Sequence, residues 1–308
     1  MEKPLIIFDT DMDTDCDDAG ALAIIYEYVR REKAELLGII TDSVSPWAAP
    51  CCDTLGQFYG IQRPIGAVSS SAYPESETLR CVKYRAHTQS LGVRRYNEKL
   101  SAGKTDADYP SAVQVYRRLL VTAEDHSVTI VCVGVLSALH QLSLSLPDEV
   151  CPLSGTDLLA QKVDKVICMA YPDKHGPNFN WEMDGIGAKE FLEKCPVPVY
   201  VSGEGQKVIT GSSLTSVLSP GHPLRYIYET WNLGPHRGRS SWDLIAVLYA
   251  LDPQVPVLEV QPRQQAGFDP GECRSYWGGG CRQDFEIVQT VSNEDMASFL
   301  EKRMVGEF

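Results

Sequence analysis

Short apolar runs alternate with longer segments of helical pattern over the first two thirds of the chain. The apolar runs predict strands at residues 5–8, 35–41, 65–68, 128–133, 165–169 and 197–202. The segments between them predict helices at residues 18–31, 48–59, 111–123, 135–145 and 187–194. This alternation favours an α/β fold, with an open, mostly parallel or mixed β-sheet flanked by helices.

The remaining segments have weaker patterns. Residues 73–109 are polar and carry seven Lys or Arg residues, so we expect loops and short helices at the surface. Residues 224–251 have a helical pattern that breaks at Gly234-Pro235. After Asp252-Pro253, short strands and the Gly278-Gly279-Gly280 run predict a small C-terminal antiparallel appendage. There is no internal repeat and no clear linker, so residues 1–308 are expected to form a single domain.

The most informative polar segment lies between the first strand and the first helix, where residues 9–18 contain six aspartates. Like charges at this density repel, so the cluster needs a divalent cation, exposure to water or raised pKa values. Oxygen ligands alone favour calcium or magnesium over zinc. Open α/β sheets place their functional sites at the carboxyl ends of strands, so the position of this cluster predicts a functional site.

Several interpretations of the cluster can be compared. A calcium-binding EF-hand loop needs Gly at position 6 and Glu at position 12, and neither possible register supplies them. A phosphatase of the haloacid dehalogenase type needs Asp-x-Asp-x-Thr/Val, and Asp13 or Asp15 occupies the last position. A solvated acidic turn is a third possibility, although the sequence on both sides is apolar.

A fourth interpretation accounts for more of the chain. Asp9-Thr10-Asp11, followed by Asp17-Asp18-Ala19 at a helix start, resembles the long form of the nucleoside hydrolase motif. Three further segments are similar to this family's motifs and occur in the same order: Val131–Leu139, Asn178-Phe179-Asn180-Trp181-Glu182-Met183-Asp184, and Ser241-Trp242-Asp243-Leu244-Ile245-Ala246-Val247. The similarity runs from residue 5 to about residue 252.

This resemblance implies calcium-dependent hydrolysis of the N-glycosidic bond of ribonucleosides, or of a related N-riboside, to base and ribose. The implied calcium ligands are Asp11, Asp18, the Val133 carbonyl and Asp243. Asp11 would also act as the general base that activates a metal-bound water. The implied substrate-binding residues are Asp17 and Asn180 at the ribose hydroxyls, Asn178 at the 5′-hydroxyl and Trp242 against the base.

The chain also departs from the family pattern. The family's Asn after the second strand has no match in Thr41-Asp42-Ser43-Val44-Ser45-Pro46. Asn178 stands in the place of a Glu, and Trp242 stands where many members have a histidine that protonates the leaving base. His236 is therefore a candidate for the leaving-group acid. An alternative function is a non-catalytic or weakly active nucleoside- or ribose-binding protein on the same scaffold.

Composition narrows the functional classes. The net charge of −13 argues against nucleic acid or an anionic membrane as a partner and suits a small-molecule substrate. The N-terminus leads directly into the first strand without a signal peptide. We interpret the ten scattered cysteines as free thiols, and both features lead us to expect a cytoplasmic protein. The family resemblance further implies a homodimer or homotetramer. We expect Asp13 to face solvent, and Trp231 to be a packing residue.

Overall fold

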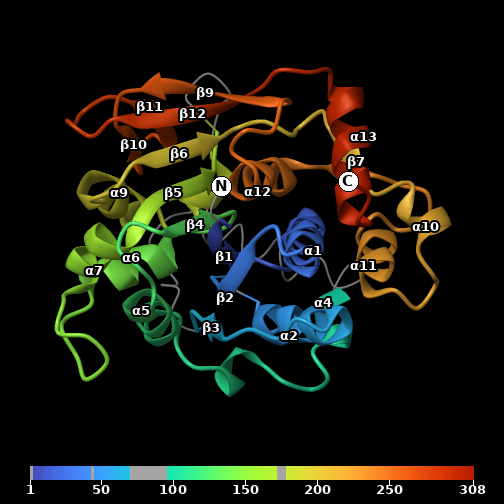
Figure 1. Ribbon diagram of the computed structural model, residues 1–308, viewed down its shortest axis with the longest axis horizontal. Coiled ribbons are helices and arrows are strands. Elements are labelled where there is room, and N and C mark those ends of the chain that lie inside the picture. The colour runs from blue at the N-terminus through green and yellow to red at the C-terminus, as the bar shows by residue number, and fades with distance from the viewer. Residues whose placement is uncertain (1–2, 43–44, 70–95, 172–177) are drawn as a thin grey trace.

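A computed structural model of the protein describes residues 3–42, 45–69, 96–171 and 178–308. Its centre is an eight-stranded sheet with the order β3-β2-β1-β4-β5-β6-β12-β9, in which every pairing is parallel except that between β12 and β9 (Figure 1). The strands are β1 (Leu5–Thr10), β2 (Glu35–Thr41), β3 (Ile65–Ala67), β4 (Val128–Cys132), β5 (Val163–Met169), β6 (Val199–Ser202), β9 (Leu258–Arg263) and β12 (Asp284–Gln289). The predicted α/β fold is confirmed.

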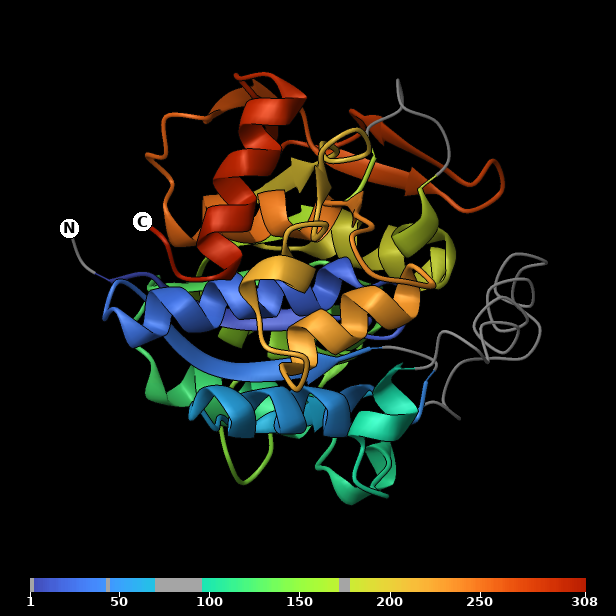
Figure 2. The same ribbon diagram turned by 90° about the vertical axis from the view of Figure 1, so that its right-hand side faces the viewer.

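Helices cover both faces of this sheet (Figure 1). One side carries α1 (Asp17–Arg30), α2 (Ala48–Tyr59), α11 (Pro223–Trp231), α12 (Trp242–Leu251) and α13 (Asn293–Met304). Figure 2 looks onto this side and shows α1 between α2 and α13. The other side carries α5 (Ala112–Thr122), α6 (Ser137–Leu144), α7 (Gly155–Lys162) and α9 (Gly185–Lys194). Short helices are α4 (Tyr96–Leu100), η2 (Asp106–Asp108), α8 (Phe179–Glu182) and α10 (Leu214–Val217).

The β1 strand shows how the sequence builds two cores. Its side chains alternate across the sheet, so Ile6 and Phe8 enter the core beneath α1 while Ile7 enters the core beneath α5 and α6. The chain extends the sheet from β1 through β2 to β3 and then returns to place β4 on the other side of β1. This reversal creates a crevice at the carboxyl ends of β1 and β4, where ligands bind in open α/β sheets.

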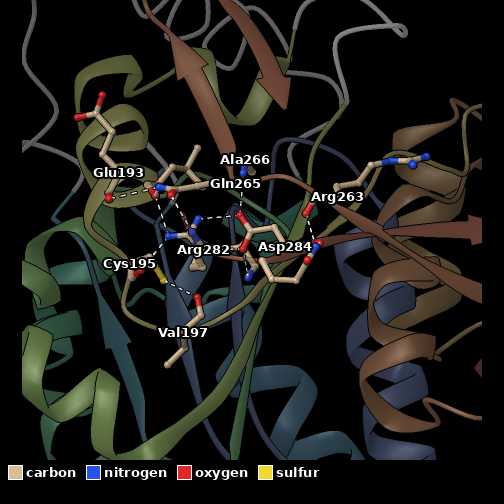
Figure 3. A network of polar contacts seen from close by, with 11 residues as sticks. Glu193, Cys195, Val197, Arg263, Gln265, Ala266, Arg282 and Asp284 are labelled. Atoms are coloured by element: carbon tan, nitrogen blue, oxygen red, sulfur yellow. Dashed lines mark hydrogen bonds and ion pairs between the residues drawn. The ribbon is translucent and has the colours of Figure 1, made fainter. Parts of the chain in front are cut away.

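The C-terminal segment forms more than an appendage. The antiparallel pair β10 (Ala266–Asp269) and β11 (Arg274–Trp277) agrees with the prediction. However, β9 and β12 join the main sheet as its edge, and α13 was not predicted. A polar network attaches β12 to its neighbours (Figure 3): buried Asp284 accepts hydrogen bonds from Arg282 and from the Val199 and Ala266 amides.

The segment between α11 and α12 is also more ordered than its sequence suggested. The helical pattern of residues 224–251 breaks between Trp231 and Trp242, and part of the break is strand β8 (Arg239–Ser240). This strand pairs with β7 (Ile209–Thr210), which lies some thirty residues earlier. The pairing brings residue 239 directly in front of α12 and fixes its backbone.

Two further features concern the described residues as a whole. Within them, no helix combines the length and apolar character that crossing a membrane requires. All nine cysteines of the described part are free thiols, eight of them buried, including Cys273, whereas Cys281 is exposed. The predicted free thiols are thus present.

Candidate active site

A cavity of about 240 Å³ opens at the carboxyl ends of β1, β4 and β5. Most of the predicted site residues line it together, although they come from positions between 11 and 243 in the sequence. The lining residues are Asp11, Thr14, Asp15, Asp17, Asp18, Val133, Met169, Tyr171, Asn178, Phe179, Asn180, Trp231, Arg239, Trp242 and Asp243. The cavity therefore contains many carboxylates on one part of its wall and several aromatic rings on another.

The carboxylates are positioned by the turn from β1 into α1. Asp17 and Asp18 occupy the first turn of α1, where the positive end of the helix dipole favours negative charge. Thr10 donates a hydrogen bond to Asp18, and the amide of Asp243 donates to Asp17 Oδ2 at 3.2 Å. Thr14 donates to Asp11 Oδ2 at 2.7 Å. All of these carboxylates are buried, which excludes the solvated acidic turn.

Asp17, Asp18 and Asp243 each offer a carboxylate oxygen, and these atoms all lie within 4.8 Å of one another. Burial, followed by the neighbouring carboxylates, raises the pKa of each of the three groups well above its usual value. Such a set needs protons or a cation to neutralise it, and its oxygen donors suit a hard divalent cation. The resemblance implies Asp11 as a cation ligand and Asp17 as a ribose ligand, but here Asp17 belongs to the group of three, whereas Asp11 lines the cavity.

The opposite wall comes from the end of β4 and from α8. Asn180 Nδ2 donates to the Val133 carbonyl at 2.5 Å and to the Met169 carbonyl at 3.3 Å. Its Oδ1 has no hydrogen-bond partner within the described residues and is available to a ligand. Asn178 caps α8 by accepting from the Trp181 amide, while its buried Nδ2 has no partner in the described part of the chain. Both amides can therefore bind a polyhydroxylated molecule.

A second buried carboxyl pair lies behind the cavity. Asp9 and Asp42 are both fully buried, with carboxylate oxygens within 4.8 Å of each other, and Asp9 also accepts a hydrogen bond from Tyr116. Burial raises the pKa of Asp9 to about 7 and that of Asp42 well above its usual range. A protonated carboxyl at residue 42 supplies a donor, as the family's Asn would. Gly134 is required here, because a Cβ would lie 2.5 Å from Asp42 Oδ1 and from the Asp11 amide nitrogen.

The aromatic wall was only partly predicted. Trp242 lines the cavity as expected, and Tyr171, Phe179 and Trp231 join it. The interpretation of Trp231 as a packing residue was therefore incomplete, since its buried ring also faces the cavity. Burial raises the pKa of the Tyr171 phenol to about 12, so this hydroxyl stays protonated at neutral pH.

Two predictions about polar residues do not agree with the structure. His236 is exposed, is absent from the cavity lining, and donates its backbone amide to Thr215 Oγ1 at 3.0 Å. The geometry gives no support to His236 as the leaving-group acid. Asp13 is 3% exposed rather than facing solvent, because its amide donates to the buried Tyr96 hydroxyl. His175, which precedes the Asn178 motif in the sequence and is a further candidate for the pocket, lies outside the described residues.

One cationic residue of the cavity, Arg239, could not be identified from the motifs. Arg239 forms a bidentate ion pair with Asp15, with Nε–Oδ distances of 2.9 and 2.8 Å. Its guanidinium carbon lies 5.3 Å from the centre of the Trp242 ring. The nearby Trp242-Asp243 motif was the available signal, because residues just before a site helix often reach the same crevice.

Comparisons with known proteins agree with this geometry. No family model and no curated protein matches the sequence. Among solved structures, a plant nucleoside hydrolase aligns over 98% of this chain and 99% of its own, with 16% identity and a TM-score of 0.68. The inosine-uridine preferring nucleoside hydrolase from Bacillus anthracis aligns over 99% of both chains, with 13% identity and a TM-score of 0.67.

A third similar structure is the type III effector protein XopQ complexed with adenosine diphosphate ribose. It aligns over 99% of this chain and 94% of its own, with 14% identity and a TM-score of 0.73. The alignments extend over nearly the whole chain, while the identities are low. Together with the strand order and the motifs at the cavity, they show that this chain has the nucleoside hydrolase fold.

Proposed function

We propose that this protein hydrolyses the N-glycosidic bond of ribonucleosides, or of a related N-riboside, in a calcium-dependent reaction. The observation that carries the proposal is the grouping of Asp17, Asp18 and Asp243 in one buried cavity with Asp11 and Asn180. Carboxylates, a free amide oxygen and aromatic rings are the groups that a sugar with developing positive charge and a departing base require.

The cation is supported by the chemistry of the donors. Three buried carboxylates within 4.8 Å of one another, together with the Val133 carbonyl at the cavity wall, would hold calcium through oxygen alone. When bound, calcium neutralises these carboxylates and lowers the pKa of a water molecule. Magnesium demands a more regular octahedron and retains its own waters, so we favour calcium.

Asp11 is the general base of the proposed reaction. It lies directly after β1, and the hydrogen bond from Thr14 fixes one carboxylate oxygen, so its orientation is set before substrate binds. Its function is to accept a proton from the water that attacks the anomeric carbon. The surrounding carboxylates stabilise the positive charge that develops on the ribose as the bond to the base breaks.

The remaining residues bind and orient the substrate. Asn180 Oδ1 would accept from a ribose hydroxyl, while Nδ2 remains on the Val133 carbonyl. The unpartnered Asn178 Nδ2 would donate to the 5′ oxygen. Trp242 offers an aromatic surface to the base. Asp17 can contact a ribose hydroxyl as well as the cation, because its two oxygens can serve different partners.

The test is ribose release from inosine, guanosine, adenosine, uridine and cytidine by the wild type and by Asp11→Asn. We expect calcium-dependent release by the wild type and a loss of at least about 10²-fold in the variant, with the fold intact. Binding of ribonucleosides without turnover by the wild type would instead establish the binding-protein alternative. XopQ, a similar structure complexed with adenosine diphosphate ribose, supports the proposal of a ribose-containing ligand.

A further inference from the structure

The proposed reaction leaves one chemical requirement without an assigned residue. When the C1′–N bond breaks, its electron pair leaves with the base, and the developing anion has to be stabilised. His236 is exposed and does not line the cavity, and Trp242 occupies the position of the family's histidine. An indole can stack on a base, but its N–H is not an acid at neutral pH.

Arg239 is the only cationic side chain that lines the cavity in the part of the chain that the structure describes. Its backbone is fixed by the β7–β8 pairing, in which Thr210 is opposite Arg239. Its side chain is half-buried and lies over the ring of Trp242, the residue that we assign to the base. A positive charge therefore lies at the end of the cavity where the base would depart.

Asp15 fixes this guanidinium. The ion pair engages Nε and Nη2, which leaves both N–H groups of Nη1 without a partner among the described residues. Asp15 is itself held, because its side chain accepts from the Cys16 amide at 2.7 Å and its carbonyl accepts from the Tyr96 hydroxyl at 2.6 Å. A guanidinium restrained in this way is preorganised and keeps donors available for a ligand.

We propose that Arg239, held by Asp15 across the face of Trp242, donates hydrogen bonds to the departing base and stabilises its negative charge. This inference rests on the proposed function. In the step, the electron pair of the C1′–N bond goes to the base nitrogen, and the water oxygen bonds to C1′. Asp11 accepts the proton from that water, and the base anion takes a proton from solvent after the bond has broken.

Arg239 acts in this step through its charge and its donors and does not transfer a proton. Burial lowers the pKa of the Arg239 guanidinium, but the hydrogen bonds to Asp15 and the nearby carboxylates outweigh it and raise the pKa above an already high value. The need for Arg239 should therefore depend on the leaving group. A purine that leaves as a poorly stabilised anion requires it, whereas p-nitrophenolate is a stable anion and does not.

The experiment measures kcat/KM for inosine and for p-nitrophenyl β-D-riboside with the wild type and with Arg239→Gln. We expect Arg239→Gln to lower the value for inosine by about 10²–10³-fold and that for the nitrophenyl riboside by less than about tenfold. Asp15→Asn should show the same selectivity with a smaller loss, because it only loosens the guanidinium. Arg237→Gln is the matched control, since Arg237 is exposed and contacts the Asn232 carbonyl.

Three outcomes would overturn the proposal. An equal loss on both substrates would mean that Arg239 serves the ribose site or the fold. An unchanged value for inosine would remove Arg239 from the reaction. A selective loss in Tyr171→Phe with none in Arg239→Gln would assign the donor to the Tyr171 phenol. If the wild type cleaves neither of these substrates and none of the other four common ribonucleosides, the proposed function itself fails, and this result is distinguishable from the others.

Discussion

Replacing Asp243 by Asn tests whether the buried carboxylates form a cation site. Two ionised carboxylates 4.8 Å apart repel by about 3.5 kcal/mol at an effective dielectric constant of about 20. Asp243 has two such neighbours, Asp17 and Asp18, and the pKa of each group is raised by burial and by the others. Without a cation, ionisation of this cluster therefore opposes folding.

Asp243→Asn should have opposite effects without and with calcium. Relief of each repulsive pair raises the melting temperature in chelator by up to about 5 °C, given an unfolding entropy of about 2.1 cal/mol/K per residue over 308 residues. Calcium at about 100 times its dissociation constant stabilises the wild type by about 2.7 kcal/mol, or about 4 °C. The variant has lost a ligand, so the same calcium concentration should shift its melting temperature by less than about 1 °C.

The assay is thermal unfolding at neutral pH in chelator and in a calcium series. Asp164→Asn is the control, because it removes the same charge from a half-exposed residue near the start of β5, away from the cavity. It should retain the calcium shift of the wild type. A variant at residue 243 that melts lower than the wild type in chelator, or that keeps the full calcium shift, would refute the reasoning.

Two further predictions concern buried carboxyls outside this group. The pKa of Asp9 is raised to about 7 in the folded protein, so its ionisation opposes folding increasingly as pH rises from about 4 to about 7 and by a constant amount above that. Between about pH 5 and pH 8, the unfolding free energy of Asp9→Asn should therefore fall by about 2–3 kcal/mol less than that of the wild type. Urea titrations in chelator measure this difference, and an equal fall in both proteins would contradict the prediction. Asp284→Ala removes the acceptor shared by Arg282 and two backbone amides (Figure 3), and should lower the free energy of unfolding by about 3–5 kcal/mol in the same assay. A loss below about 1 kcal/mol would show that this network does not attach the edge of the sheet.

The sequence predicted the parts of the site that local chemistry determines. The run from β1 into α1 could be recognised because a buried strand, a carboxylate cluster and a helix start follow one another within twenty residues. The helices that were missed carried a readable signal as well. Ser154 and Ser292 each cap a helix and are followed three residues later by Asp157 and Asp295.

Other features depend on residues that are distant in the sequence. The burial of Asp13 depends on Tyr96, which lies 83 residues further along the chain. Whether His236 or Arg239 reaches the cavity is decided by the pairing of β7 with β8, and alternation alone cannot predict two-residue strands. Asp42 was read as a departure from the family pattern, and only its burial beside Asp9 indicates that it can carry the proton that an Asn amide would supply.

Ribose release from the five common ribonucleosides tests the central claim most directly. The protein is first freed of metal with a chelator and then titrated with calcium, and the product is measured as reducing sugar. We predict no release in chelator and release from at least one nucleoside once calcium is restored. Release that is equal with and without chelator would contradict a cation-dependent reaction. No release from any of the five, although calcium raises the melting temperature, would contradict the hydrolysis of these nucleosides and leave only a calcium-binding site.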